Sequence, residues 1–391
     1  MEEKVSPAGP LRILMAAGVP KRREGGVAAI IYNLGSEMER RGHQVTYVLL
    51  DDLIAPGTVW ARSLELIFAR RLAQYIVKNR ASFSLVNLHA PTGFIYGMRR
   101  WVGAGDYPPY VMCLHGLEER RVHVMSREAK KGRAWNFSWR NRAWHWLYHQ
   151  PRFRWSIKTA DGAHTYSRDV WTLLQLKYNL DAERVAYIAN GVESRFFIAR
   201  QYRQTDALRL LYAGTWLDQR GIFYIREALR KLALSFPKLT MTFAGCAVPS
   251  EEIEKFFGKE LQGHVVVRPV IAAERMQELY AEHDVLLFPS LMEGLPSVLL
   301  EAMATGMPVI TTETCGMPDV VEHEYNGLLV APANAGAIEE AVTRMARSVE
   351  LRQKLGGAAR ETMKRYTWER AGAQLEALFL RILGLEGRTL K

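Results

Sequence analysis

The stretch FPSLMEGLPSVLLEAMATGMPVITT, residues 288–312, places two glutamates, Glu293 and Glu301, eight residues apart in an otherwise apolar segment. Pro296 suits the first turn of a helix, because its missing N–H needs no partner there. Glu293 then lies in the loop that enters the helix, and Glu301 lies inside the helix. Eight helical residues span on the order of 12 Å, which is the length of a sugar, a diphosphate and a ribose laid along the helix start.

This spacing indicates a site for a sugar nucleotide. Glu293 would accept hydrogen bonds from sugar hydroxyls, and Glu301 from the two hydroxyls of a ribose. The backbone N–H groups from Gly294 to Ser297 have no helical partner and would hold the diphosphate between them. A glutamate on a helix more often belongs to a solvated face. The Gly-Leu-Pro insert and the strand-like run that precedes it favour the binding role.

Short apolar runs alternate with helical patterns along the chain. In 27–38, for example, apolar residues recur at helical spacing, and a long helix is predicted over 63–79. A polar stretch at 199–209 reads as a linker, after which the alternation starts again. This order predicts two α/β domains, each with a parallel sheet covered by helices on both faces, with a cleft between their ligand-binding ends. The predicted strands are 11–17, 44–50, 83–89, 110–116, 162–167, 184–192, 209–215, 239–245, 264–270, 284–290, 307–312 and 326–330.

Composition narrows the class of protein. A chain of 391 residues with 48% hydrophobic residues is enough for two packed domains. The three cysteines are too scattered for a disulfide framework or a zinc site, which favours a reducing cytoplasm. No apolar run reaches the roughly 18 residues of a membrane span, and the first residues hold no signal-peptide core.

The positive charge is uneven. Residues 1–195 hold 29 Lys and Arg against 17 Asp and Glu, a balance of +12, whereas residues 196–391 hold 23 against 24, a balance of −1. This asymmetry predicts an anionic partner for the first half, which could be a membrane, a nucleic acid or a phosphorylated substrate. The pair Gly25-Gly26 lies between a strand and a helix, where backbone can approach an anion. A full G-x-G-x-x-G pattern is missing, so the two glycines could instead form a simple tight turn without a ligand.

Together these residues resemble glycosyltransferase family 4, whose members are retaining enzymes of the GT-B fold. The resemblance runs from about residue 11 to 385, and the Glu-x7-Glu segment with its flanks is its most specific part. The other matching pieces are EGGVAAIIYNLGSEMERRGHQVTYV (24–48), LHG (114–116), IANGVESRFF (188–197), AGTWLDQRGI (213–222), YNGLLV (325–330) and YTWERAGAQLEALF (366–379).

The resemblance implies an architecture of two Rossmann-like domains with an interdomain cleft. Residues 1–200 would form the N-terminal, acceptor-side domain and residues 201–370 the nucleotide-sugar donor domain. Residues 371–391 would form a C-terminal helix that crosses back to the first domain.

The resemblance also implies roles for single residues. His115 would reach the sugar near the reacting carbon, and Arg220, where the family usually has lysine, would neutralise the leaving diphosphate. Thr215 stands where the family usually has arginine. Either Arg220 and helix N–H groups suffice, or a basic residue of the first domain replaces the missing charge. The implied catalytic residues are His115, Arg220 and Glu293, and the implied donor-binding residues are Gly25, Gly26, Gly214, Thr215, Arg220, Pro269, Val270, Gly294, Leu295, Pro296, Ser297 and Glu301.

The resemblance implies sugar transfer with retention of configuration, without a metal or another cofactor. Other readings stay open at this point. A phosphorylase or a sugar-nucleotide epimerase shares the fold, although no stretch supplies the lysine that a pyridoxal-phosphate phosphorylase needs. A non-catalytic sugar- or membrane-binding protein is a further alternative. No nucleic-acid partner is expected, because the basic residues form no recognised nucleic-acid module.

The acceptor side is predicted from residues 118–158, which hold eleven Lys and Arg, three acidic residues and five of the ten tryptophans. Basic residues interleaved with aromatics suit a membrane interface, although the tryptophans could instead pack on the first domain. The sequence predicts a cytoplasmic enzyme, peripheral at the inner membrane face, with a lipid-linked or envelope-glycan acceptor; a small soluble acceptor is the alternative. The predicted contacts are Trp135, Trp139, Arg140, Arg142, Trp146, Arg152 and Arg154, with Trp135, Trp139 and Trp146 on one helical face.

Overall fold

The computed structural model describes residues 9–21, 26–55, 57, 61–103, 105–116, 118–135 and 137–385. The prediction of two α/β domains with parallel sheets is confirmed, because the described residues form two six-stranded parallel sheets. The chain divides into two compact units. The first holds the residues up to Glu119, 139–190 and those from Trp368 onward, and the second holds 120–138 and 191–367.

The sheet of the first unit has the order β2-β1-β3-β4-β5-β6. Strands β3 and β4 are buried along their whole length, as expected for a parallel sheet with both faces covered. Each of the six strands falls on an apolar run predicted from the sequence. They are β1 (Arg12–Ala17), β2 (Gln44–Leu49), β3 (Leu85–His89), β4 (Tyr110–Leu114), β5 (Gly162–Thr165) and β6 (Val185–Tyr187).

Two sets of helices cover this sheet. One set shares a hydrophobic core with the strands through side chains such as Phe68, Tyr96 and Ile157, whereas α1 and α15 pack on each other. The helices of this unit are α1 (Gly26–Arg40), α2 (Leu50–Leu53), α3 (Ala61–Lys78), α4 (Phe94–Val102), α6 (Trp139–Trp144), α7 (Gln150–Thr159), α8 (Arg168–Tyr178) and α15 (Trp368–Ile382). Helix α5 (Glu118–Lys130) begins in the first unit, and its residues from Arg120 onward belong to the second.

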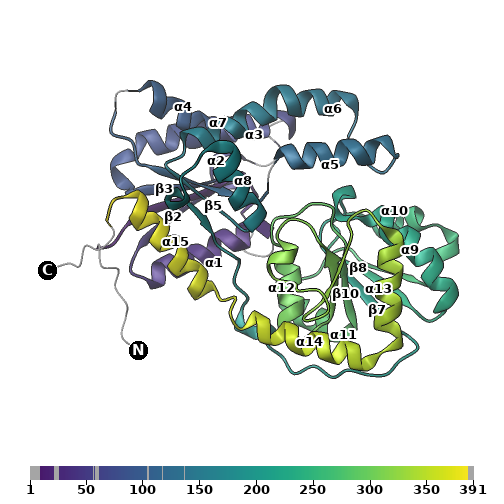
Figure 1. Ribbon diagram of the computed structural model, residues 1–391. Helices are drawn as coiled ribbons and strands as arrows, with labels where there is room; N and C mark the ends of the chain where they lie inside the picture. The colour runs from purple at the N-terminus through teal and green to yellow at the C-terminus, as the bar shows by residue number, and fades with distance from the viewer. Residues whose placement is uncertain are drawn as a thin grey trace. The chain divides into compact units, whose positions relative to one another are not determined.

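Helix α15 brings the end of the chain against its beginning, and Figure 1 shows α15 and α1 side by side. The helices approach closely because Gly372 has no side chain: a Cβ there would lie 2.7 Å from the Cβ of Glu37. Glu376 of α15 also accepts hydrogen bonds of 2.9 Å from Arg41 and from Nε2 of His43. Apolar packing and a charged cluster thus fix the C-terminal helix on the first unit.

The sheet of the second unit has the order β12-β11-β10-β7-β8-β9, and its six strands also match the predicted runs. The strands are β7 (Arg209–Ala213), β8 (Thr240–Ala244), β9 (Val265–Arg268), β10 (Val285–Phe288), β11 (Val309–Thr312) and β12 (Leu328–Val330). The helices are α9 (Ile222–Ser235), α10 (Ser250–Phe257), α11 (Met276–Glu282), α12 (Ser297–Ala304), α13 (Ala335–Arg347) and α14 (Val349–Met363).

Strand order determines where each sheet binds ligands. In the second unit β7 lies between β10 and β8, so the chain leaves β7 and β10 toward opposite sides of the sheet. In the first unit the same holds for β1 and β3. Open parallel sheets bind ligands at the carboxyl ends of strands at such switch points. A ligand site is therefore expected at the loops that follow β7, β10, β1 and β3.

Candidate active site

The two loops at the switch point of the second unit are joined tightly. Gly221, with φ of 77°, ends the short 3₁₀ helix Asp218–Arg220 after β7. A Cβ at Gly221 would lie 2.1 Å from the carbonyl oxygen of Pro289, so only glycine permits this approach. The N–H of Leu291 donates a 2.8 Å hydrogen bond to the carbonyl of Gln219. The loop after β7 is thereby held against the loop after β10.

This junction brings Arg220 and Glu293 together as an ion pair. Their side chains are 17% and 20% exposed. Burial raises the pKa of Glu293, and the positive charge of Arg220 and the N–H of Gly294 oppose that rise. The guanidinium of Arg220 also lies over the ring of Phe288, 5.1 Å from its centroid. A cation and a carboxylate, both predicted to contact donor, thus lie at one point of the site.

Helix α12 begins beside Glu293. The sequence placed Pro296 in its first turn, but Pro296 has an extended backbone with ψ of 126° and caps a helix that starts at Ser297. The correction is small, and the first N–H groups of α12 still lack helical partners, as at any helix start. The carbonyl of Gly294 accepts a hydrogen bond from Gly316, which fixes the approach to the helix, and Leu295 is buried.

Glu301 lies inside α12, four residues after the helix begins, and receives a 2.8 Å hydrogen bond from the hydroxyl of Tyr280 in α11. Burial raises the pKa of Glu301 to about 7, although the Tyr280 hydroxyl favours its charged form. Glu193 raises this pKa further and Arg195 lowers it, so the segment that opens the second unit also influences the carboxylate. A partly buried carboxylate with one donor has capacity for further hydroxyl groups.

A pocket of about 480 Å³ opens after β9, next to α11. Its volume falls in the range of ligand sites. Val270, implied with Pro269 as a donor-binding residue, is among its lining residues and is 83% exposed. Pro269 holds its backbone in place by accepting a hydrogen bond from Ala247. Leu279 also lines the pocket, directly before the Tyr280 that binds Glu301.

The loop that lacks the usual arginine contains Gly214, with φ of 138°, and the exposed Thr215. The next residue, Trp216, is buried. Two arginines from helix α5, which precedes the linker in sequence, reach this part of the second unit. Nε of Arg121 donates a 3.1 Å hydrogen bond to Gln219, and Arg120 lies 3.9 Å from the sulfur of Cys315.

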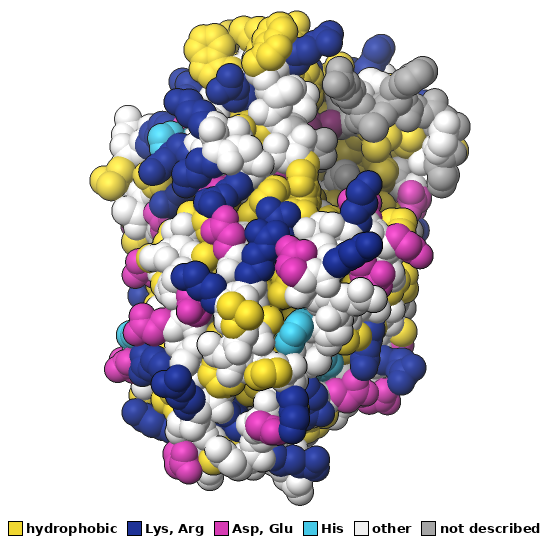
Figure 2. All heavy atoms as spheres, turned by 90° about the vertical axis from the view of Figure 1, so that its right-hand side faces the viewer, with side chains coloured by type: hydrophobic (Ala, Val, Ile, Leu, Met, Phe, Trp, Pro, Cys, Tyr) yellow, Lys and Arg dark blue, Asp and Glu magenta, His cyan; other side chains and the backbone are white. Residues whose placement is uncertain are grey.

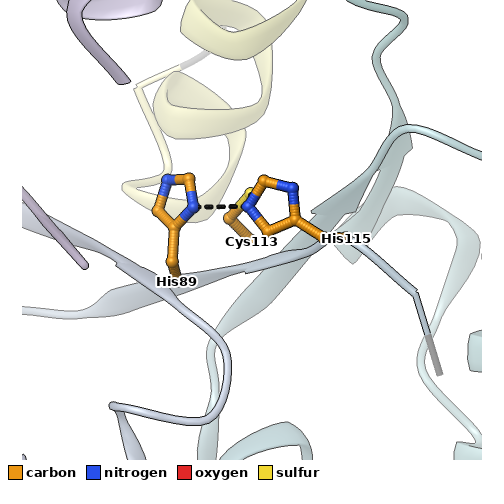
Figure 3. Close-up of side chains that lie close together, drawn as sticks. All are labelled: His89, Cys113 and His115. Atoms are coloured by element: carbon orange, nitrogen blue, oxygen red, sulfur yellow. Dashed lines mark hydrogen bonds between the residues drawn. The ribbon is translucent and has the colours of Figure 1, made fainter. Parts of the chain in front are cut away.

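In the first unit, half-buried His115 follows β4 and lies close to the buried side chains of His89 and Cys113 (Figure 3). Its Nε2 is 2.7 Å from Nδ1 of His89, at the end of β3, and 3.9 Å from the sulfur of Cys113. Burial lowers the pKa of His115 to about 4 and holds the pKa of His89 well below its ordinary value. Both rings are neutral near pH 7, so one donates and the other accepts.

The first loop of this unit falls partly outside the described residues. Gly25 belongs to that undescribed stretch. Gly26 begins α1 with φ of 62°, a conformation that favours glycine. Among the described residues other than its chain neighbours, no atom lies within 4 Å of the position that a Cβ would occupy there.

The predicted membrane segment is only partly as expected. Trp135 does not share a helical face with Trp139 and Trp146, because α5 ends at Lys130 and Trp135 lies in an irregular stretch. Its ring stacks on Trp216 of the second unit with 5.6 Å between centroids. Trp139 and Trp146 are 71% and 68% exposed in the first unit.

The basic residues of this segment also differ among themselves. Arg140 is exposed and Arg142 is half-buried. Arg154 forms an ion pair with Glu119, and Arg152 lies over the ring of Phe94. In the face of the molecule that Figure 2 shows, hydrophobic side chains gather at the upper edge with Lys and Arg beside them. Across the described residues, no helix is both long enough and apolar enough to cross a membrane.

Comparison with protein families gives a direct assignment. The family described as glycosyl transferases group 1 matches residues 194–362, and the one described as glycosyltransferase family 4 matches residues 24–196. The chain belongs to glycosyltransferase family 4. The two matches meet at residues 194–196, so this family 4 chain carries both halves of the pattern in the expected order.

Individual relatives are more distant. The sulfoquinovosyl transferase SQD2 of Arabidopsis thaliana is 30% identical over 198 residues, which are 47% of this chain and 38% of that protein. The family 4 chain spans about half the length of the curated relatives it matches. Among solved structures, sucrose-phosphate synthase from Thermosynechococcus elongatus superposes with a TM-score of 0.79 at 19% identity, over 96% of this chain and 99% of that one.

A second solved structure contains a donor. Anabaena HepE, in complex with UDP-glucose, superposes with a TM-score of 0.68 at 15% identity, over 94% of this chain and 98% of that one. At these identities the likeness shows the fold, which is GT-B: an α/β fold of two domains.

Three contacts in these sites were not predicted from the sequence. The contact of His89 with His115 could have been predicted. FSLVNLH and YVMCLHG each carry a histidine at the end of a buried strand, and parallel strands end at the same edge of a sheet. No sequence pattern indicates the contact of Tyr280 with Glu301, because the two residues belong to different helices. The contact between Arg121 and Gln219 likewise links segments that are far apart in the sequence.

Proposed function

We propose that this family 4 chain transfers a sugar, with retention of configuration, from a nucleoside-diphosphate sugar to a lipid-linked or envelope-glycan acceptor at the cytoplasmic membrane face. The observation that supports donor use most directly is the pairing of Arg220 with Glu293 at the start of α12. One group has the charge that a diphosphate needs, and the other has the acceptors that sugar hydroxyls need.

When the donor binds, Arg220 and Glu293 separate, and each contacts a part of the donor instead. The diphosphate takes the guanidinium of Arg220 and the first N–H groups of α12, where the helix dipole also favours an anion. Sugar hydroxyls donate to Glu293, and ribose hydroxyls donate to Glu301 beside Tyr280. The base enters the pocket that Val270 lines. Each donor fragment then meets a group of matching chemistry.

The chemical step releases a nucleoside diphosphate, whose phosphate oxygens gain negative charge. Preorganised cations and N–H donors that stabilise such charge are usually the largest single contribution to catalysis. Arg220 is held in advance by Glu293 and by the ring of Phe288. Arg121, bound to the neighbouring Gln219, is the candidate for the charge that Thr215 does not supply.

Retention without a covalent enzyme intermediate fits the resemblance of 288–312 to retaining enzymes. The acceptor attacks from the face that the diphosphate leaves, and the diphosphate oxygen takes the acceptor proton. His115, neutral and held by His89, is suited to donate or accept a hydrogen bond with the sugar rather than to carry charge. No metal takes part in this scheme.

The membrane acceptor rests on the exposed tryptophans Trp139 and Trp146, with the basic Arg140 beside them. Large exposed aromatic side chains are costly in water and are enriched at the level of lipid headgroups. A soluble acceptor remains the alternative function, and the acceptor assay below separates the two.

The proposal is tested in two stages. Thermal unfolding of the full chain is measured with UDP-, GDP-, ADP- and dTDP-sugars, because a bound donor raises the melting temperature by mass action. The stabilising donor is then incubated with a lipid extract or with soluble sugars, and nucleotide release and the anomeric configuration of the product are measured. Absence of stabilisation by every donor would contradict the donor site. Inversion would contradict retention, and transfer only to soluble sugars would contradict the membrane acceptor.

A further inference from the structure

A second group of metal-binding side chains lies in the first unit, distinct from the histidines of Figure 3. It consists of Glu118 at the start of α5 together with His145 and His149, the two ends of a π-helical turn. One ligand atom from each lies within 4.8 Å of the others, and each side chain is 12% exposed. We propose that this group binds a divalent transition-metal ion, for which zinc is the best chemical match, and that the ion holds the π-helical turn in place.

The distances fit a single ion. Oε1 of Glu118 is 2.9 Å from Nδ1 of His145 and 3.8 Å from Nδ1 of His149. Ligand atoms that share one tetrahedral zinc ion, at the usual bond lengths, are about 3.4 Å apart. The two distances to Glu118 thus lie within about half an ångström of that spacing, and all three ligand atoms lie within 4.8 Å of one another. Two histidines four residues apart on one helical segment are a common way to supply two such ligands.

A fourth residue, Glu65, lies where it can accept a hydrogen bond from one of the proposed metal ligands. Nε2 of His149, the nitrogen on the far side of its ring from Glu118, is 3.4 Å from Oε2 of Glu65 in α3. Metal-bound imidazoles usually donate their other N–H to a carboxylate, which fixes the tautomer. Oε1 of Glu65 is buried without a hydrogen-bond partner among the described residues, which is costly for a carboxylate oxygen.

The charges also favour an ion. His149 faces a carboxylate on each side. A cation bound to the lone pair of one ring nitrogen would place a positive charge between these carboxylates. Imidazole ligands favour zinc and its neighbours, whereas magnesium and calcium prefer sites built from oxygen atoms alone.

The proposed ion would join three parts of the first unit. Glu65 comes from α3, Glu118 from α5, and the histidines from the turn His145–His149. The residues between the two histidines, Trp146, Leu147 and Tyr148, are 68%, 57% and 54% exposed. The inner side of the turn thus holds the ligands and its outer side displays apolar surface. A π-helical turn is rare and often marks a functional position.

Cobalt is the probe, because Co²⁺ occupies zinc sites and reports its ligands in its absorption spectrum. The full chain is stripped with a chelator and titrated with CoCl₂, and bound metal is counted after dialysis. The double variant His145→Gln/His149→Gln is compared with His123→Gln, an exposed histidine on α5 that is not part of the group. Cys113→Ser tests the histidine–cysteine group of Figure 3, whose thiolate would add a charge-transfer band in the near ultraviolet.

The proposal predicts one Co²⁺ per chain, visible bands without a thiolate band, loss of binding in the double variant, and unchanged binding in His123→Gln and Cys113→Ser. Glu65→Gln should keep the stoichiometry and bind about 10- to 100-fold more weakly, as changes behind a metal ligand usually do. This variant decides the matter if the double variant does not fold. Wild-type binding no tighter than that of the double variant, a thiolate band, or full affinity in Glu65→Gln would each overturn the proposal.

Discussion

Arg220 and Glu293 form an ion pair between the loops that follow β7 and β10, although 72 residues separate them in the sequence. Arg220 favours the charged form of Glu293, because burial alone would raise the pKa of Glu293 and the positive charge of Arg220 opposes that rise. The pair therefore links the two functions proposed for it. Removing the cation weakens diphosphate binding and also favours a protonated Glu293, which is a poorer acceptor for sugar hydroxyls.

Arg220→Ala is expected to lose most transfer activity and nucleotide affinity. The variant lacks the cation that binds the diphosphate, and its Glu293 is more readily protonated. Arg220→Lys should recover part of the activity, since it keeps the charge with a different geometry. Glu293→Gln should lower turnover tenfold or more while keeping nucleotide affinity, because it removes a charged acceptor worth roughly 1.5–3 kcal/mol. The measurements are turnover and nucleoside-diphosphate affinity by calorimetry, with circular dichroism as a check on folding.

Arg230→Ala is the matched control for that series, because Arg230 belongs to α9 in the same unit and pairs with Glu260 at the surface. It should bind nucleotide and turn over like the unsubstituted chain. An Arg220→Ala variant that binds nucleoside diphosphate as tightly as wild type would show that the phosphate site lies elsewhere.

Glu301 should make stability fall as pH rises. Its pKa is about 7 in the folded chain and 4.5 in the unfolded one, so the folded state binds more protons between these values. The free energy of unfolding therefore decreases from pH 4.5 to about pH 7. Glu301→Gln removes this titration, so its stability relative to wild type should improve across that window. Urea unfolding at several pH values measures it, with the exposed Glu340→Gln as control.

The same carboxylate predicts proton release on donor binding. Ribose hydroxyls bind the ionised form, so a nucleotide that engages Glu301 lowers its pKa and expels a proton near neutral pH. Affinity should rise from pH 6 to pH 8, and calorimetry in buffers of different ionisation enthalpy should detect the proton. Glu301→Gln should abolish both effects. Identical proton release in that variant would assign the titration to another group.

Arg121 is expected to supply the charge that Thr215 does not. Arg121→Ala should reduce turnover about tenfold, and Arg121→Lys should restore part of it, since a charge near Gln219 and Arg220 is what the loop needs. Arg127, exposed on the same helix, is the control: Arg127→Ala should leave turnover unchanged. Equal turnover in the two alanine variants would mean that Arg220 and the helix N–H groups suffice.

The buried histidines of the first unit predict the opposite dependence on pH. The folded pKa is about 4 for His115 and about 3 for His164, whereas the unfolded value is 6.5. The unfolded state then binds more protons between pH 6.5 and about 4, so the free energy of unfolding falls as pH falls through this window. His164→Gln should flatten this dependence, and the exposed His123→Gln should not. Unfolding curves between pH 4 and pH 7 measure the effect.

The strands were predictable because the signal of a buried parallel strand is local. Each is a short apolar run between turn residues, and all twelve runs became strands. The order of the strands is not local, since it depends on which helices cover which face. The pairing of Arg220 with Glu293 depends on that order, because it requires β7 to lie beside β10. The sequence therefore indicated both residues for the donor site without predicting their contact.

Trp135 shows why the rest could not be predicted. The interleaved tryptophans suggested one continuous face, but Gly132, with φ of 70°, follows the end of α5 and changes the direction of the chain. Trp135 then packs on Trp216, Phe223 and Phe256, which lie 81 to 121 residues later in the sequence. Apolar surface that packs inside a unit and apolar surface that meets lipid have the same composition, so only the fold distinguishes them.

Membrane binding is therefore expected to depend on Trp139, Trp146 and Arg140, and not on Trp135. Trp139 and Trp146 are exposed, whereas Arg152 and Arg154 contact Phe94 and Glu119 within the first unit. Trp139→Ser/Trp146→Ser should reduce sedimentation with anionic vesicles at least fivefold, because two large aromatic side chains lose their place at headgroup depth. Arg140→Ser should weaken binding at low salt, with less effect once salt screens the charge.

Leu176→Ser is the control for the tryptophan variant. Leu176 is 76% exposed on α8 of the same unit but lies outside 118–158, so its loss should leave vesicle binding unchanged. Circular dichroism should be the same for all variants, since none of these side chains is buried. If wild type and the tryptophan variant remain equally in the supernatant with neutral and anionic vesicles, the chain does not bind membranes through this surface. The soluble acceptor then becomes the better proposal, because the donor site makes no use of these tryptophans.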